Sequence, residues 1–152
     1  MGSCIAKPIV SNENTKYPKY IPEITKGKVV KVYDGDTITI IGRVKHNPKL
    51  YKFSVRLAGI DCPEMRTNND NEKEIAIKAK EYLVKEIFDK EITLRKVDTE
   101  KYGRLLAYVY LGKRCMNVEL MVNNLAVPYD GGKKIVPDDW VEYWRSCPAN
   151  II

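Results

Sequence analysis

Residues 28–40, with the sequence KVVKVYDGDTITI, decide the fold. The valine-rich first half, residues 28–32, has the composition of a β-strand, and residues 36–40 alternate polar and apolar side chains as a returning strand would. Between them lies Asp34-Gly35, a dipeptide that favours the tight turn of a β-hairpin. The stretch therefore predicts two antiparallel strands joined at residues 34–35.

The segments that follow extend this hairpin. A polar loop over residues 43–49, which contains the only histidine of the chain, His46, leads to a third predicted strand at residues 51–58. Two further strands are predicted at residues 91–97 and 105–111. Three strands in a row, each joined to the next by a short link, favour a meander that can curl into a barrel.

One long helix is predicted between the third and fourth strands. The polar run at residues 66–71 is prone to form turns, and Asn71 is placed to cap a helix with Glu74 three residues later. Apolar residues then follow at four-residue spacing, as expected for one buried helix face. They are Ile75, Ala79, Leu83 and Ile87.

Two shorter helices are expected nearer the C-terminus, at residues 117–123 and 138–145. Trp140 and Trp144 would pack the second of them against the barrel, and stacking on a nucleic-acid base is the alternative. Five strands with a helix after the third is the order of an OB-like Greek-key barrel. The predicted fold class is therefore mainly β with helices (α+β), a five-stranded OB-fold-like barrel with about three helices.

Residues 1–25 are polar and contain three prolines, a composition that predicts a flexible tail. The first residues, MGSCIAK, fit an N-myristoylation site with Gly2 as acceptor and Cys4 placed for palmitoylation, although Ala6 stands where Ser or Thr is preferred. An unmodified tail or a cloning remnant is the alternative. Two acyl chains would hold the protein stably at a membrane, whereas one would not.

Composition sets the expected partners and compartment. The net charge of +6 suits a polyanion such as DNA or RNA, because each phosphate contact releases counterions, although the same surplus can serve solubility alone.

The four cysteines form no CxxC pair, so we expect free thiols in a reducing compartment and no zinc site. With neither a secretory signal nor a spanning segment, the expected location is intracellular and cytoplasmic, with membrane association only through acylation. No oligomer signal is present, so a monomer is expected.

Three short clusters carry the chemistry: DGDT at residues 34–37, RLAGIDCPE at residues 56–64 and KYGR at residues 101–104. A lone histidine excludes mechanisms that need a histidine pair, and sparse serines give no support to a Ser-His-Asp triad. Carboxylates and guanidiniums remain. A hard cation such as calcium prefers carboxylate and carbonyl oxygens, and arginine forks suit a phosphate with developing charge. The clusters therefore predict phosphodiester hydrolysis.

In these three clusters, in their order and in the helix between the second and third, the chain resembles the staphylococcal nuclease family, also called thermonucleases. The resemblance covers residues 26–132 and implies a nuclease domain of this type over residues 26–152, with Ca²⁺ as cofactor. Asp36 and Asp61 would be the carboxylate ligands, and the backbone carbonyl of Cys62 would add a third protein oxygen.

The same resemblance implies roles for the other cluster residues. Glu64 would orient or deprotonate the attacking water. Arg56 and Arg104 would hold the scissile phosphate and stabilise the charge that builds up in the transition state. Lys101 and Tyr102 would contact a neighbouring phosphate, and Tyr129 would stack on the nucleotide or bond near it.

Structural explanations compete with parts of this interpretation. Asp34-Gly35 is more often only a hairpin turn, and an ion pair between Arg56 and Asp61 is a common structural feature. If the whole set had no functional meaning, however, two aspartates, one glutamate and two arginines would all have to stand at the family's spacing by chance. We therefore expect a calcium-dependent, sugar-nonspecific endonuclease of DNA and RNA, with a preference for single-stranded or frayed substrate. The alternatives are a catalytically inactive nucleic-acid-binding module and a membrane-tethered scaffold.

Three features depart from the family pattern. Cys62 stands where the secreted bacterial enzyme has threonine; a backbone ligand should survive this change, but a thiol beside the site would make activity sensitive to oxidation. The loop at residues 43–49 is longer, which would alter substrate preference. The chain after Gly132 is shorter, which would alter stability or product affinity.

Overall fold

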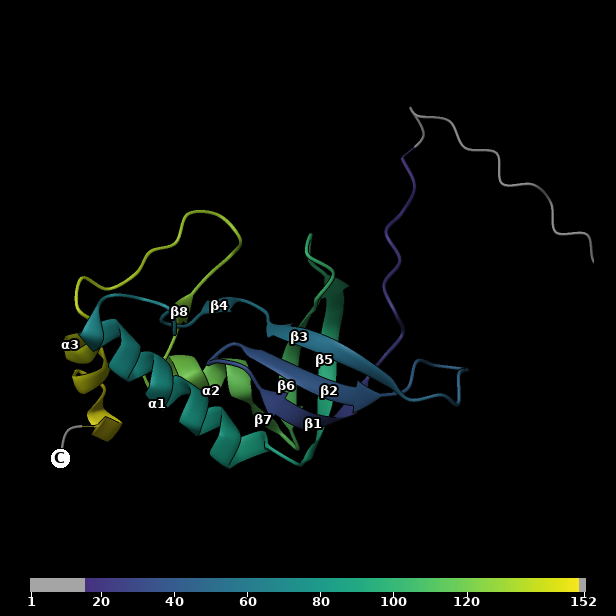
Figure 1. Ribbon diagram of the computed structural model, residues 1–152, viewed down its shortest axis with the longest axis horizontal. Helices are drawn as coiled ribbons and strands as arrows, with labels where there is room; N and C mark the ends of the chain where they lie inside the picture. Colours follow the sequence, from purple (N-terminus) through teal and green to yellow (C-terminus); the bar gives the residue numbers. More distant parts are fainter. Residues whose placement is uncertain (1–15, 151–152) are drawn as a thin grey trace, which may run out of the picture.

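The computed structural model describes residues 16–150 of the chain, so Gly2 and Cys4, the predicted acylation sites, lie outside the described residues. Its main feature is a five-stranded β-barrel with helices around one side (Figure 1). The strands are β1 (Lys26–Val32), β2 (Thr37–Gly42), β3 (Tyr51–Leu57), β5 (Glu91–Thr99) and β6 (Leu105–Leu111). This arrangement confirms the predicted barrel.

The strands run in the order β3-β2-β1-β5-β6, and every neighbouring pair in this order is antiparallel. A parallel pairing between β3 and β6 closes the barrel, with Arg56 opposite Leu106. The first hairpin turns as predicted, because the backbone N–H of Tyr33 donates to the carbonyl of Thr37 over 2.9 Å. Apolar side chains that alternate along the strands, among them Val29, Ile38 and Val55, are fully buried in the barrel interior.

The long helix α1 (Asp70–Ile87) packs along the barrel (Figure 1). The four apolar residues predicted for its inner face, at 75, 79, 83 and 87, are all buried, which confirms the helical period. The predicted cap is wrong by two residues. Asn69, not Asn71, caps the helix by accepting a hydrogen bond from the N–H of Glu72 at 3.1 Å, while the amide of Asn71 donates to Asp139.

The second and third helices are α2 (Met116–Val122) and α3 (Trp140–Arg145), followed by the short 3₁₀ helix η1 (Pro148–Asn150). Asp139 caps α3, so this helix begins two residues later than predicted. Trp140 is buried as expected, but α3 packs beside α1, and the Lys78 ammonium of α1 lies 4.6 Å from the Trp144 ring centroid. Trp140 and Trp144 join the hydrophobic core that the barrel residues form, and α1 is the element that lies against α3.

Three two-residue strands complete the structure: β4 (Ile60–Asp61), β7 (Arg114–Cys115) and β8 (Val127–Pro128). Such short strands have no sequence period, so none was predicted; β4 forms only because β8 pairs with it. Within residues 16–150 no helix is long and apolar enough to cross a membrane.

Residues just before β1 already contact the barrel. Ile24 is buried, and the carbonyl of Thr25 accepts a hydrogen bond from the N–H of Leu94 at 2.8 Å. The carbonyl of Glu23 accepts one from Lys45 in the β2–β3 loop. The division into a tail over residues 1–25 and a domain over residues 26–152 stays a prediction.

Gly35 allows the β1–β2 turn to lie directly on α1. A Cβ atom at this position would meet the Ala79 Cβ at 2.7 Å and the Cys62 Sγ at 2.9 Å, which is closer than real Cβ contacts. Neither neighbour is the far end of a flexible side chain. The glycine therefore sets how deeply the turn, and with it Asp34 and Asp36, sits against the helix.

We predict that Gly35→Ala destabilises the fold by about 1–3 kcal/mol, because the new methyl group overpacks a tight contact. Urea unfolding of the two proteins measures this difference. Gly112→Ala is the matched control: its Cβ would meet nothing within 4 Å, so it should cost only the backbone penalty of a positive φ, about 1 kcal/mol. An equal loss in the two variants would show that close packing at Gly35 is not the cause.

Candidate active site

A guanidinium held between two buried carboxylates forms the centre of the site. Arg56, near the end of β3, places Nη1 2.9 Å from Asp36 Oδ2 and Nη2 2.8 Å from Asp61 Oδ1. Asp36 is 5% exposed and Asp61 is 3% exposed. Asp36 precedes β2 and Asp61 ends β4, so the arginine joins two segments that the barrel brings to one end of β3.

Further hydrogen bonds orient the Asp36 carboxylate. The Thr37 hydroxyl donates to Oδ1 at 3.0 Å, and the backbone N–H of Cys62 donates to Oδ2 at 3.3 Å. The N–H of Asp36 itself donates to the Asp34 carboxylate at 3.1 Å, so Asp34 stabilises the turn, in keeping with its interpretation as a turn residue. Burial raises the pKa of Asp36 to about 6, and the nearby Arg56 charge offsets this rise only in part.

Lys134, which the sequence analysis did not single out, reaches into the same site. Its ammonium lies 2.9 Å from Asp61 Oδ2 and 3.2 Å from Glu64 Oε1. Burial lowers the pKa of Lys134, but the two carboxylates outweigh this and raise it above its usual value. Lys134 belongs to the loop between β8 and α3, where residues 131–134 read GGKK; no spacing relates it to the three clusters. Only the folded chain brings it to Glu64.

The third cluster forms the opposite wall. Arg104 donates from Nη2 to Glu100 Oε2 at 3.0 Å, so a carboxylate of its own loop holds its guanidinium. Lys101 and Tyr102 are exposed, with the ammonium 4.9 Å from the tyrosine ring centroid. Tyr129 is anchored through its backbone, whose N–H donates to the carbonyl of Gly59 at 3.0 Å.

These walls enclose a cavity of about 540 Å³. It is lined by Asp34, Asp36, Thr37, Arg56, Cys62, Pro63, Glu64, Glu100, Lys101, Tyr102, Arg104, Tyr129 and Lys134. Every site residue predicted inside the barrel domain lines it except Asp61, which lies behind the lining and pairs with Arg56 and Lys134. We call this cavity the charged cleft.

The Cys62 thiol is buried beside the cleft. Burial, followed by the charge of Asp36, raises the pKa of this thiol well above its ordinary value. Because the thiolate is the reactive form, this environment works against the oxidation sensitivity expected from the sequence.

The donors at the centre of the cleft fit a hard cation by their chemistry, since Asp36 and Asp61 offer carboxylate oxygens, and the neighbouring Cys62 thiol has a raised pKa that keeps it in its neutral form. Among residues 16–150, no three His, Cys, Asp or Glu side chains gather closely enough to hold a metal ion by themselves. A cation would therefore also need the backbone carbonyl of Cys62 and water. Arg56 and Lys134 now occupy carboxylate oxygens that such an ion would use.

Fold and cleft together define a class: an OB-like barrel that presents carboxylates and guanidiniums to one cavity. Residues 54–139 match the Staphylococcal nuclease homologue family, and the chain belongs to this family.

Several relatives support the assignment. The chain is 32% identical over 101 residues to a thermonuclease of Staphylococcus hyicus, covering 65% of this chain and 56% of that protein. It is 29% identical over 153 residues to a probable endonuclease of Schizosaccharomyces pombe, covering 86% and 66% of the two chains. It is 32% identical over 100 residues to an endonuclease of Saprolegnia parasitica, covering 57% and 46%. The chain thus spans about half the length of most relatives that it matches.

We predict that Asp36→Asn stabilises the protein at pH 8 in the presence of a chelator, by about 1–3 kcal/mol. A carboxyl whose pKa is raised in the folded state stabilises folding while protonated and loses that contribution as pH rises through about 6. The asparagine stays neutral at every pH. The gain in the free energy of unfolding of Asp36→Asn over the wild type should therefore shrink as pH falls below 6 and vanish near pH 4. Urea unfolding at several pH values measures it.

Asp138→Asn, at an exposed carboxylate ahead of α3, is the control and should not reproduce this pH dependence. An Asp36→Asn variant that is less stable than the wild type at pH 8 would contradict the prediction.

Proposed function

We propose that this protein is a calcium-dependent, sugar-nonspecific endonuclease that hydrolyses phosphodiester bonds of DNA and RNA. The observation that carries the proposal is the convergence of two buried aspartates, Glu64 and two arginines on one cleft of about 540 Å³. The thermonuclease and endonuclease names of the relatives support it.

Asp36, Asp61 and the backbone carbonyl of Cys62 would hold the calcium ion. When bound, such an ion neutralises charge on a phosphate and lowers the pKa of nearby water. Among the side chains, Glu64 is suited to accept a proton from water, since it lines the cleft and its side chain is 64% exposed. An accessible carboxylate can meet water without first leaving a buried position.

Arg104 and Arg56 differ in how they could act on the phosphate. The Arg104 side chain is 31% exposed and pairs with one glutamate, Glu100. Two oxygens of a phosphate can bind the two N–H groups of its guanidinium side by side and so replace that glutamate. Arg56 is 16% exposed and already bridges two aspartates, so it positions the carboxylates and adds positive charge behind the phosphate. Arg104 is therefore the better candidate for direct transition-state contact.

The substrate class follows from what the cleft offers. Its charged side chains suit phosphate and a cation, and phosphate contacts carry no sequence information. Acylation of Gly2 and Cys4, which lie outside the described residues, would place this activity at an intracellular membrane surface.

The first test is cleavage of single-stranded DNA and RNA with calcium, with magnesium and with chelator. Calcium should restore cleavage after chelation, and Glu64→Gln and Arg104→Ala should each lower kcat by at least about 100-fold, because both groups act in the transition state. Gel analysis of end-labelled strands measures this, and internal products identify an endonuclease.

Glu81→Gln on α1 and Arg145→Ala on α3 make the same chemical changes on exposed helix faces and should cleave as the wild type does. If the folded wild type binds the strand yet never cuts it with any metal, the protein is a binding module and the nuclease proposal fails.

A second test concerns Lys134, whose ammonium neutralises Asp61 and Glu64 and so competes with a cation for the same oxygens. We predict that Lys134→Met tightens calcium binding about two- to fivefold, because a partly exposed ion pair is worth about 1 kcal/mol or less. Isothermal titration calorimetry measures the Kd directly.

Lys133→Met removes the same charge from the neighbouring residue, which forms no ion pair with a carboxylate of the described chain, and should change the Kd less. Unchanged or weaker calcium binding by Lys134→Met would contradict the competition.

A further inference from the structure

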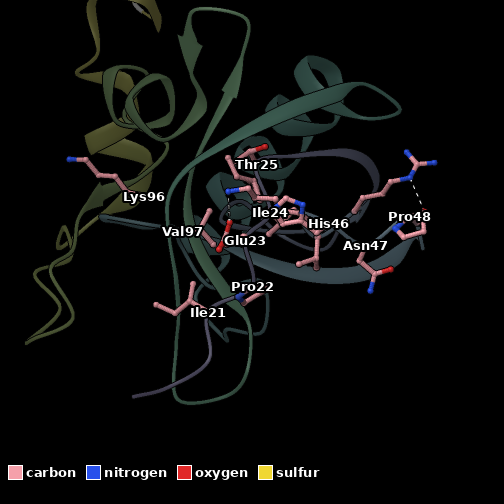
Figure 2. Close-up of a pocket in the computed structure, with 14 residues that line it drawn as sticks. Ile21, Pro22, Glu23, Ile24, Thr25, His46, Asn47, Pro48, Lys96 and Val97 are labelled. Carbon is pink, nitrogen blue, oxygen red and sulfur yellow. Dashed lines mark hydrogen bonds and ion pairs between the residues drawn. The ribbon is translucent and has the colours of Figure 1, made fainter. Parts of the chain in front are cut away.

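Two further cavities follow one another beside the cleft. The cleft shares Glu100 and Lys101 with a second cavity of about 580 Å³. That cavity shares Pro22, Val44 and Asn47 with a third cavity of about 1100 Å³ beside the β2–β3 loop (Figure 2). We call the second and third cavities together the aromatic groove; it begins where the wall of the cleft ends.

The part of the groove nearest the cleft is aromatic. Its walls include Tyr51 and Phe53 from β3 and Tyr20 from the segment that precedes the barrel. The Tyr51 and Phe53 ring centroids are 6.4 Å apart, with the planes tilted by 58°. Tyr51 is 39% exposed, and Asn47 donates a hydrogen bond to its hydroxyl at 3.0 Å, which fixes the ring in place. A fixed, accessible aromatic ring is a platform on which a flat ligand can stack.

The charge along the groove is positive. Its two acidic residues are already paired: Glu100 with Arg104 and Glu23 with Lys45. Arg43 and Lys101 also line the groove, and neither forms an ion pair with any carboxylate in residues 16–150. The Arg43 Nε donates to the carbonyl of Pro48, a bond drawn as a dashed line in Figure 2. The groove thus offers uncompensated cations beside an aromatic surface.

We propose that the aromatic groove binds single-stranded nucleic acid that continues from the cleavage site, with bases stacked on Tyr51 and Phe53. Arg43 contacts a phosphate of this strand along the groove, while Lys101, at the junction with the cleft, keeps the phosphate contact that the family resemblance implies. This combination of aromatic rings and basic side chains is the one that binds single strands without sequence preference. The inference rests on the proposed function, because that function places the strand in the cleft.

The groove accounts for a preference for single strands. Bases within a duplex stack on one another and do not offer their faces to a protein ring, whereas bases of a single strand can leave the stack and do so. A cleft that contacts only phosphates would not distinguish single strands from duplexes.

The cleft also adjoins a further cavity, so the strand need not end there. This cavity of about 530 Å³ shares Arg56, Glu100, Lys101 and Tyr129 with the cleft and runs past Tyr108 toward Gly131. A strand in the aromatic groove can therefore continue past the cleft into this cavity. This arrangement suits cleavage within a strand.

The test compares the Kd of labelled single-stranded DNA of increasing length, up to about 12 nucleotides, for wild type, Tyr51→Leu and Tyr51→Phe. Fluorescence anisotropy in chelator measures binding without cleavage. Affinity of the wild type should rise with length until the groove is filled. Tyr51→Leu should weaken binding of the long strand about fivefold to 100-fold and of a dinucleotide much less, while Tyr51→Phe keeps the ring and should bind within about twofold of the wild type.

Phe88→Leu removes an exposed aromatic ring at the end of α1, remote from the groove lining, and should bind every strand as the wild type does. Thermal melting checks that each variant is folded. If Tyr51→Leu binds all lengths within about twofold of the wild type, or if Phe88→Leu loses as much affinity, the groove takes some other occupant and the proposal is wrong.

Cleavage of a nitrophenyl diester of a single nucleotide, which fills only the cleft, separates the two proposals. One outcome supports the nuclease proposal alone: the wild type cuts this ester with calcium, but the Kd for single-stranded DNA depends neither on strand length nor on Tyr51→Leu. The groove proposal is then wrong. If the wild type cuts neither ester nor strand, the nuclease proposal falls, while the dependence of Kd on length and on Tyr51 still decides the groove.

Discussion

The ion pairs of Arg56 with Asp36 and Asp61 tie together the parts of the chain that build the cleft. Burying a carboxylate is costly unless it is paired and hydrogen-bonded, and here two carboxylates share one guanidinium. The three residues lie at or next to the ends of β2, β3 and β4. The ion pairs therefore join three strand ends and present acidic oxygens to a cavity, while the burial that raises the pKa of Asp36 means that this arrangement costs some stability.

Closure of the barrel completes this arrangement. Arg56 lies opposite Leu106 in the parallel β3–β6 pairing, which brings the loop of Arg104 beside the carboxylates. Asn117, fully buried in α2, secures the seam: its amide donates to the carbonyl of Ala58 at 2.7 Å and its oxygen accepts from the N–H of Val109 at 2.9 Å. A buried amide that lost these partners would be costly, so α2 is held to the seam at which the site assembles.

The sequence predicted what local periodicity controls and missed what only tertiary contacts decide. Four-residue spacing identified the buried face of α1, and the Asp34-Gly35 turn identified the first hairpin. The cap of α1 was misplaced because three asparagines lie within residues 68–71, and local pattern does not say which side chain turns back to the backbone. Lys134 was missed because its loop follows β8, seventy residues after Glu64 in the chain, and no spacing rule joins them.

In the proposed nuclease, the cleft and the aromatic groove would divide the work between two kinds of surface. Inside the cleft, paired charges and oriented carboxylates would favour the changing charge at one phosphate, an effect that acts on the transition state and adds little to ground-state affinity. Along the groove, rings such as Tyr51 and cations such as Arg43 would contact parts of the strand that do not react. Binding energy from those remote contacts can hold a flexible strand in the cleft in the orientation that the reaction needs. Separating the surfaces also lets the β2–β3 loop vary substrate preference without disturbing the buried ion pairs of Arg56.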